Sequence, residues 1–168
     1  MPVSRAVNSD TFTSTTPSDR EIVLTRLFDA PRHLVFEAMS KPEHVKRWWG
    51  CLDERFSMPV CEIDFRPGGK YRFVGRGPEG NYPAFYGEYR EIDAPGRVVF
   101  TEFFEPFPDV ESVVTSVLTE EGGKTRLTVT CLYPTMQVRD MVLSTGMATG
   151  AGISYDRLEE VAASLQQS

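Results

Sequence analysis

The segment Asp64-Phe65-Arg66-Pro67-Gly68-Gly69-Lys70-Tyr71-Arg72-Phe73 lies in the first half of the chain and decides our assignment of the fold. Two stretches of alternating polar and apolar residues flank a Pro-Gly-Gly reversal, and this pattern is typical of a β-hairpin. A helix-like segment ends upstream at Trp48 and Trp49, and a longer helix-like segment closes the chain. This order predicts a curved antiparallel sheet that grips one helix and can enclose a hydrophobic cavity.

Composition narrows the class of protein. The length of 168 residues predicts one domain, and the net charge of -6 without a basic stripe argues against a nucleic-acid partner. The 3 cysteines have no metal-like spacing and do not suggest a disulfide scaffold, so a reducing cytoplasm fits best. No apolar run has membrane-spanning length, and no signal peptide is evident.

The first part of the chain suggests a tail followed by a strand and two short helices. Residues 1–19 are rich in Ser and Thr, and we interpret them as a flexible N-terminal tail before a single domain at 20–168. Residues 21–28 alternate as a strand does. Pro31 begins a short amphipathic helix, and Pro42 begins a second that ends at Gly50.

Six further strands are predicted from β-branched and aromatic residues between turn residues, namely Phe56–Phe65, Tyr71–Val74, Phe85–Ile92, Val98–Phe104, Ser112–Thr119 and Thr125–Tyr133. The glycine-rich segment 75–80 resembles a dinucleotide-binding pattern, but no helix follows it, so we interpret it as a hairpin loop and expect no cofactor. A helix is predicted over Thr135–Gln166. Its glycines at 146, 150 and 152 predict that it bends or breaks there, or that another group approaches its backbone closely.

The sequence resembles the START-like (SRPBCC, helix-grip) superfamily, and within it the bacterial homologues of the C-terminal domain of the activator of a heat-shock chaperone's ATPase. The residues that carry the resemblance are Phe28-Asp29-Ala30-Pro31, Pro42-Glu43-His44-Val45-Lys46-Arg47-Trp48-Trp49, the segment 64–71, Gly87-Glu88-Tyr89 and Asp156-Arg157-Leu158. The resemblance implies an α+β helix-grip fold, in which seven antiparallel strands surround the C-terminal helix and two short helices follow the first strand. It also implies a cavity between the sheet and that helix.

Relatives of this kind bind lipids, hormones or polyketide-like molecules, act as cyclases or aromatases, or serve as co-chaperones, so the fold alone does not fix the function. The candidate ligand-binding residues are Trp48, Trp49, Phe73, Phe85, Tyr89, Glu102, Met141 and Thr145. For both tryptophans, core packing is the alternative, and the more exposed ring is the better ligand candidate.

Glutamates in the predicted strands are the candidates for chemistry. An inward carboxyl in an apolar cavity has a raised pKa and can act as an acid or base. We favour surface positions for Glu62, Glu88 and Glu102, with Glu102 as the best inward candidate because it shares a strand face with Phe100 and Phe104. No residue is assigned as catalytic, and neither histidine has metal-ligand spacing.

The leading functional hypothesis is non-catalytic binding of a small hydrophobic or aromatic molecule in the cavity. One alternative is a cyclase- or aromatase-like enzyme that uses an inward carboxylate. A second is a protein-interaction module resembling the chaperone ATPase activator, and a homodimer is a further option.

Overall fold

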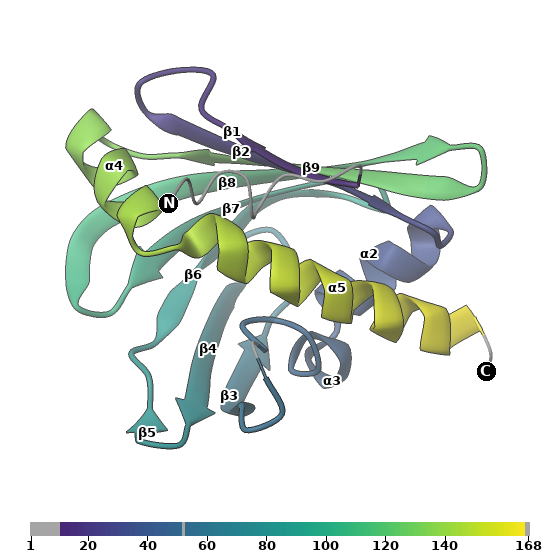
Figure 1. The fold of residues 1–168 in the computed structure, drawn as a ribbon, viewed down its shortest axis with the longest axis horizontal. Helices are drawn as coiled ribbons and strands as arrows, with labels where there is room; N and C mark the ends of the chain where they lie inside the picture. The colour runs from purple at the N-terminus through teal and green to yellow at the C-terminus, as the bar shows by residue number, and fades with distance from the viewer. Residues whose placement is uncertain (1–10, 52, 167–168) are drawn as a thin grey trace.

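The computed structural model of the chain describes residues 11–51 and 53–166, and it has the predicted α+β helix-grip architecture (Figure 1). Its elements are β1 (Phe12–Thr15), β2 (Glu21–Phe28), α2 (Arg32–Ser40), α3 (Pro42–Val45), β3 (Ser57–Ile63), β4 (Lys70–Gly77), β5 (Gly80–Asn81), β6 (Phe85–Asp93), β7 (Arg97–Phe104), β8 (Phe107–Glu121), β9 (Lys124–Leu132), α4 (Met136–Ser144) and α5 (Met147–Gln166). The strands form one antiparallel sheet in the order β1-β2-β9-β8-β7-β6-β4-β3, and β5 pairs with β4.

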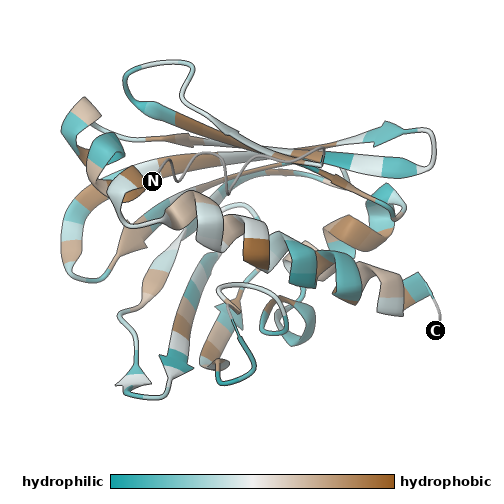
Figure 2. Ribbon diagram, viewed as in Figure 1, coloured by the Kyte–Doolittle hydropathy of each residue, from teal (hydrophilic) through white to brown (hydrophobic). Residues whose placement is uncertain are grey.

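All the predicted strands are present, and their alternation sets which side chains face the helix. Along β2 every second residue is buried, and the same alternation runs through the middle of β8 and of β9. Figure 2 shows that hydrophobic and hydrophilic residues both occur along the strands of the sheet. Because side chains alternate between the two faces of a strand, this pattern gives the sheet one apolar face. That face is the one that α5 crosses.

The Pro-Gly-Gly hairpin joins β3 to β4 as the sequence predicts. Gly68 has φ +83°, a conformation that glycine adopts at little cost. A Cβ atom on Gly69 would overlap the carbonyl oxygen of Asp64, so this position also requires glycine. Asp64 and Arg66 form an exposed ion pair at 2.9 Å, which supports the surface position of this turn.

Two sequence predictions need correction. The described part of the sheet has nine strands rather than seven, because β1 and the two-residue β5 were not expected. β1 lies inside the predicted tail 1–19, whose residues 1–10 are outside the described range. The reason is tertiary: β1 pairs with the edge of β2, and Phe12 is 5% exposed with its ring 6.1 Å from that of Tyr155.

The C-terminal helix breaks at one of its glycines. Thr135 caps α4 by accepting a hydrogen bond from the Val138 amide, and Gly146, at φ +82°, separates α4 from α5. The prediction of a bend or break in the long helix is therefore confirmed.

The second short helix is briefer than predicted, since α3 ends at Val45 and the two tryptophans lie in the turns that follow.

A buried arginine anchors α5 to the sheet. Arg26 of β2 has a side chain only 7% exposed, and its Nη1 lies 2.6 Å from Asp156 Oδ1, while Nη2 lies 3.4 Å from Glu159 Oε1. The guanidinium also lies 5.1 Å from the centre of the Phe28 ring.

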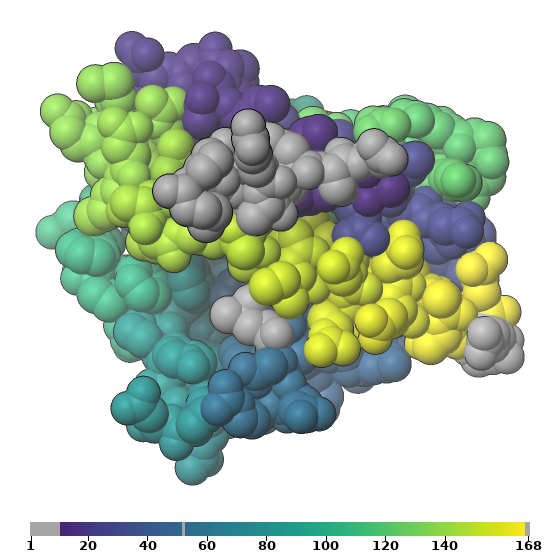
Figure 3. All heavy atoms as spheres, viewed as in Figure 1, coloured from purple at the N-terminus to yellow at the C-terminus, as the bar shows by residue number. Residues whose placement is uncertain are grey.

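α5 runs across the face of the molecule between the β1–β2 edge and the β4–β5 hairpin (Figure 3).

Two buried clusters make up the core. One joins α5 and α2 to β2, β8 and β9, and the other lies among α3, β3, β4 and β6. Phe36, Trp49 and Phe100 are partly buried and pack against both clusters. These three rings therefore connect the two clusters. No helix in the described residues has the length and apolar character needed to cross a membrane.

Candidate functional site

A cavity of about 920 Å³ lies between the sheet and the helices. Strands β2, β4 and β6 to β9 and helices α2 to α5 contribute to its wall. The wall includes all the candidate ligand-binding residues: Trp48, Trp49, Phe73, Phe85, Tyr89, Glu102, Met141 and Thr145. The structure thus brings residues far apart in the sequence into one cavity, and their contact with a ligand remains a prediction.

Aromatic rings form much of this wall and pack against one another. Trp49 lies 5.0 Å from Phe73 and 5.2 Å from Phe85, between ring centres. Phe85 stacks on Phe104 at 4.7 Å, which continues the aromatic surface from β6 to β7. Such rings give a large apolar area and the edge-and-face geometry that suits another aromatic molecule.

The two tryptophans have different roles in the structure. Trp48 is 6% exposed, and its indole Nε1 donates a 2.9 Å hydrogen bond to the Ala38 carbonyl oxygen. Trp49 is only partly buried, and no hydrogen bond from its indole is found to the described residues. Trp48 therefore serves mainly to fix the turn after α3 against α2, and Trp49 is the better ligand candidate.

Exposed apolar side chains mark the mouth of the cavity. Tyr82 after β5, Phe107 at the start of β8 and Met141 on α4 are 52%, 46% and 41% exposed, and all three line the cavity. Thr145 lies on the same side, but its hydroxyl donates to the Val142 carbonyl oxygen at 2.6 Å. α4 contains no fully buried residue, so the cavity is covered here by a loosely packed helix.

Glu102 is the acidic group of the cavity interior. It lies on β7, directly across from Ser112 of β8, and its carboxyl lines the cavity. Burial raises the pKa of Glu102 to about 7. Among the described residues, no hydrogen bond or ion pair to this carboxyl is found. Our general preference for surface glutamates is therefore wrong for Glu102, because its strand face is the inner one.

The groups around Glu102 are neutral at physiological pH. The Tyr71 hydroxyl donates to the Thr101 carbonyl oxygen at 2.7 Å, and the Tyr133 hydroxyl lies near the Cys131 thiol. Burial raises the pKa values of both tyrosines, and it raises the pKa of Cys131 to about 12. These groups hold the negative charge of Glu102 in an apolar setting without compensating it.

Two serines that the sequence analysis did not single out also line the cavity. Ser112 and Ser116 are 7% and 4% exposed and lie on the inner face of β8. Neither hydroxyl makes a hydrogen bond with the described residues. Their spacing of four, an even number, in an otherwise Val-rich strand was the available sequence pattern, and it identifies a shared face without saying which face is inward.

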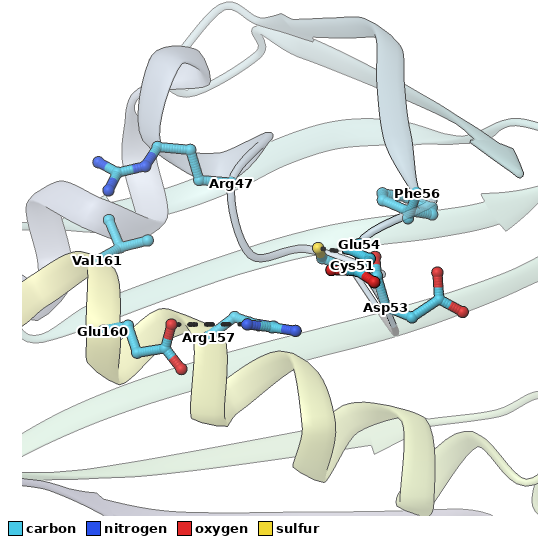
Figure 4. Close-up of a pocket in the computed structure, with 8 residues that line it drawn as sticks. All are labelled: Arg47, Cys51, Asp53, Glu54, Phe56, Arg157, Glu160 and Val161. Carbon is cyan, nitrogen blue, oxygen red and sulfur yellow. Dashed lines mark hydrogen bonds and ion pairs between the residues drawn. The ribbon is translucent and has the colours of Figure 1, made fainter.

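A second, smaller pocket of about 290 Å³ lies outside the cavity, between α5 and the segment after α3 (Figure 4). Its wall mixes charges of both signs, and Arg157 pairs with Glu160 at 3.6 Å. Within 11–51 and 53–166, no three His, Cys, Asp or Glu side chains gather in a way that would hold a metal ion. The three cysteines are free.

Comparison with known proteins agrees with this geometry. The family described as Activator of Hsp90 ATPase homolog 1-like protein matches residues 29–163. The chain belongs to this family. The match begins just after β2 and ends in the last turn of α5, so it includes β3 to β9 and most of the residues that line the cavity. A search of curated proteins gave no match.

Solved bacterial structures share the fold of this family member. A protein from Rhodobacter sphaeroides is 26% identical with a TM-score of 0.82, and the match covers 92% of this chain and 99% of that one. A Mycobacterium smegmatis protein is 25% identical with a TM-score of 0.80, and the match covers 92% of this chain and 99% of that one. A Nitrosomonas europaea protein has 24% identity and a TM-score of 0.78 over 91% of this chain and 100% of that one, which shows the fold alone.

Proposed function

We propose that this protein binds a small, mainly apolar or aromatic molecule in the cavity between the sheet and α5, without converting it. The observation that carries this proposal is the cavity itself, at about 920 Å³ with an aromatic wall and few polar groups. Ligand sites are typically concave, mainly apolar and about 300–1,000 Å³ in volume, with a few polar groups that set orientation. We propose the cytoplasm as its location.

The few polar groups of the cavity interior could orient a ligand by hydrogen bonding to one of its ends. Glu102, Ser112 and Ser116 lie on neighbouring strands, and their side chains form no hydrogen bond with the described residues. A buried polar group without a partner costs free energy. A ligand with one polar end would satisfy these groups while its apolar part contacts the rings.

A second candidate is acid–base chemistry on the bound molecule. Burial raises the pKa of Glu102 to about 7, so near neutral pH this carboxyl is available in both protonation states. A general acid or base works best when its pKa is close to the working pH. This observation favours the cyclase- or aromatase-like alternative, which requires that the bound molecule change chemically.

The first experiment is to purify the protein from its native host and to search for bound small molecules by native mass spectrometry, followed by denaturing release. We expect a stoichiometric apolar or aromatic molecule. Ser112→Leu should fill part of the cavity and reduce the bound fraction, whereas Ser57→Leu, the same change at an exposed position of β3, should not.

Chemical conversion is tested with the same ligand. Unchanged mass after long incubation supports binding alone, and a product that Glu102→Gln no longer forms supports the enzyme. If the protein is empty and no lipid or aromatic compound raises its melting temperature, the binding proposal fails. The protein-interaction alternative, with a chaperone or a second copy as partner, then becomes the better proposal.

A further inference from the structure

Few charged residues line the cavity, and one of them has no partner of opposite charge among the described residues. Among its described lining residues, only Asp53, Arg55 and Glu102 are charged. Asp53 and Arg55 pair with each other, with Arg55 Nη2 3.0 Å from Asp53 Oδ2, and both side chains are well exposed, at 48% and 69%. Glu102 is therefore the one lining charge in the described residues that has no partner of opposite sign.

The residues that face Glu102 offer no cation. Tyr71 approaches from β4, Cys131 from β9, Tyr133 from the residue that follows β9, and Tyr155 from α5. Burial raises the pKa of each of these groups, so all four are neutral at physiological pH. Ser112 across the strand pair is uncharged. A negative charge on Glu102 thus has no counter-ion among the described residues of the protein.

The rings beside Glu102 are suited to a positive charge. Phe100 and Phe104 flank it on the same face of β7, and both line the cavity. Tyr71 lies against Phe100 in an edge-to-face arrangement, with ring centres 5.6 Å apart. The faces of aromatic rings attract cations, most strongly where water is excluded. Rings and a carboxylate together form the surroundings that a desolvated ammonium group needs.

We propose that the preferred ligand is an aromatic molecule that carries one cationic amine, with the Glu102 carboxylate as its counter-ion. This inference rests on the proposed function, because it assumes that the cavity takes a ligand. A neutral alcohol of the same shape can donate one hydrogen bond to Glu102, but it leaves the buried negative charge without compensation. The amine supplies both the hydrogen bond and the charge.

Proton linkage follows from this pairing. Burial raises the pKa of Glu102 to about 7, so at pH 6.5 much of the free protein carries a proton on this carboxyl. An ammonium ligand selects the ionised form, and its binding therefore releases a proton from the protein. A neutral alcohol places no such requirement on the carboxyl.

The test is isothermal titration calorimetry with 1-naphthylmethylamine and 1-naphthylmethanol, which differ only in the polar group. Wild type should bind the amine about tenfold or more tightly than the alcohol at pH 8, as expected for a charge-assisted hydrogen bond. Glu102→Gln should lose this preference and still bind the alcohol within about threefold of wild type. Glu62→Gln, which removes an exposed carboxylate from β3, should retain the preference.

A second readout separates pairing from a general effect of charge. At pH 6.5, the heat of amine binding to wild type should vary with the ionisation enthalpy of the buffer, and for Glu102→Gln it should not. Equal affinity for the two compounds, or a preference that survives in Glu102→Gln, overturns the inference and leaves the proposed function intact. If wild type binds neither compound, both proposals fail for aromatic molecules of this size.

Discussion

Replacement of Glu102 by Gln should make the protein more stable than wild type as the pH rises. The pKa of Glu102 is about 7 in the folded protein and about 4.5 in a solvated chain, because burial disfavours the charged form. The folded state therefore holds its proton more tightly than the unfolded state. By linkage, this carboxyl does not affect the free energy of unfolding below about pH 4.5. From there to about pH 7 it lowers the free energy of unfolding by an increasing amount.

The magnitude follows from the two pKa values. Their difference of about 2.5, at about 1.4 kcal/mol for each unit, gives a cost in free energy of unfolding of about 3–4 kcal/mol well above pH 7. Only part of this cost is present at pH 5.5. Between pH 5.5 and 8.5, the difference in free energy of unfolding between Glu102→Gln and wild type should rise by about 2 kcal/mol in favour of the variant.

Urea unfolding followed by tryptophan fluorescence measures this difference, with both proteins titrated in the same buffers at several pH values. Glu62→Gln controls for the removal of one carboxylate from an exposed position of the sheet. A difference between Glu102→Gln and wild type that stays constant from pH 5.5 to 8.5 would refute the reasoning, as would one that falls. A constant difference would mean that Glu102 is solvated in the folded protein, and a falling one would mean that the folded protein favours its charged form.

Three further predictions concern the walls and the anchor of the cavity. Trp48→Ala should cost about 3–5 kcal/mol in urea unfolding, because the ring is buried and hydrogen bonded, whereas Trp49→Ala should cost less and weaken ligand binding more in calorimetry. Asp156→Asn should cost about 1 kcal/mol, since Asp156 is 70% exposed and Glu159 still faces Arg26; no loss in urea would contradict the anchoring role. Gly146→Ala should cost about 1–2 kcal/mol at φ +82°, and a neutral result would mean that α4 and α5 are not separated by this conformation.

Local patterns predicted most of the fold. The Pro-Gly-Gly reversal, the alternating strands and the helix-breaking Gly146 act through short-range rules, and each appears where the sequence placed it. β1 was missed because Ser and Thr give it no clear periodicity. Its strand conformation depends on Phe12 reaching Tyr155 and on pairing with β2, which are contacts between distant parts of the chain.

The direction of Glu102 was harder to predict for a related reason. Both faces of β7 carry aromatic residues, with Phe100 and Phe104 on one face and Phe103 on the other. Hydrophobic alternation therefore does not say which face is inner, and a shift of one residue would exchange them. The anchor between Arg26 and Asp156 was missed because it joins residues 130 positions apart.

The break at Gly146 gives the covering helix two unequal parts. α5 is held by buried side chains and by the Arg26 ion pairs, while α4 has no fully buried residue. Segments with few buried contacts open locally at low free energy without global unfolding. Amide hydrogens of α4 should therefore exchange faster than those of α5, and a molecule in the cavity that contacts Met141 should slow α4 selectively. Exchange rates along this one helix pair would then report occupancy of the cavity before the ligand is identified.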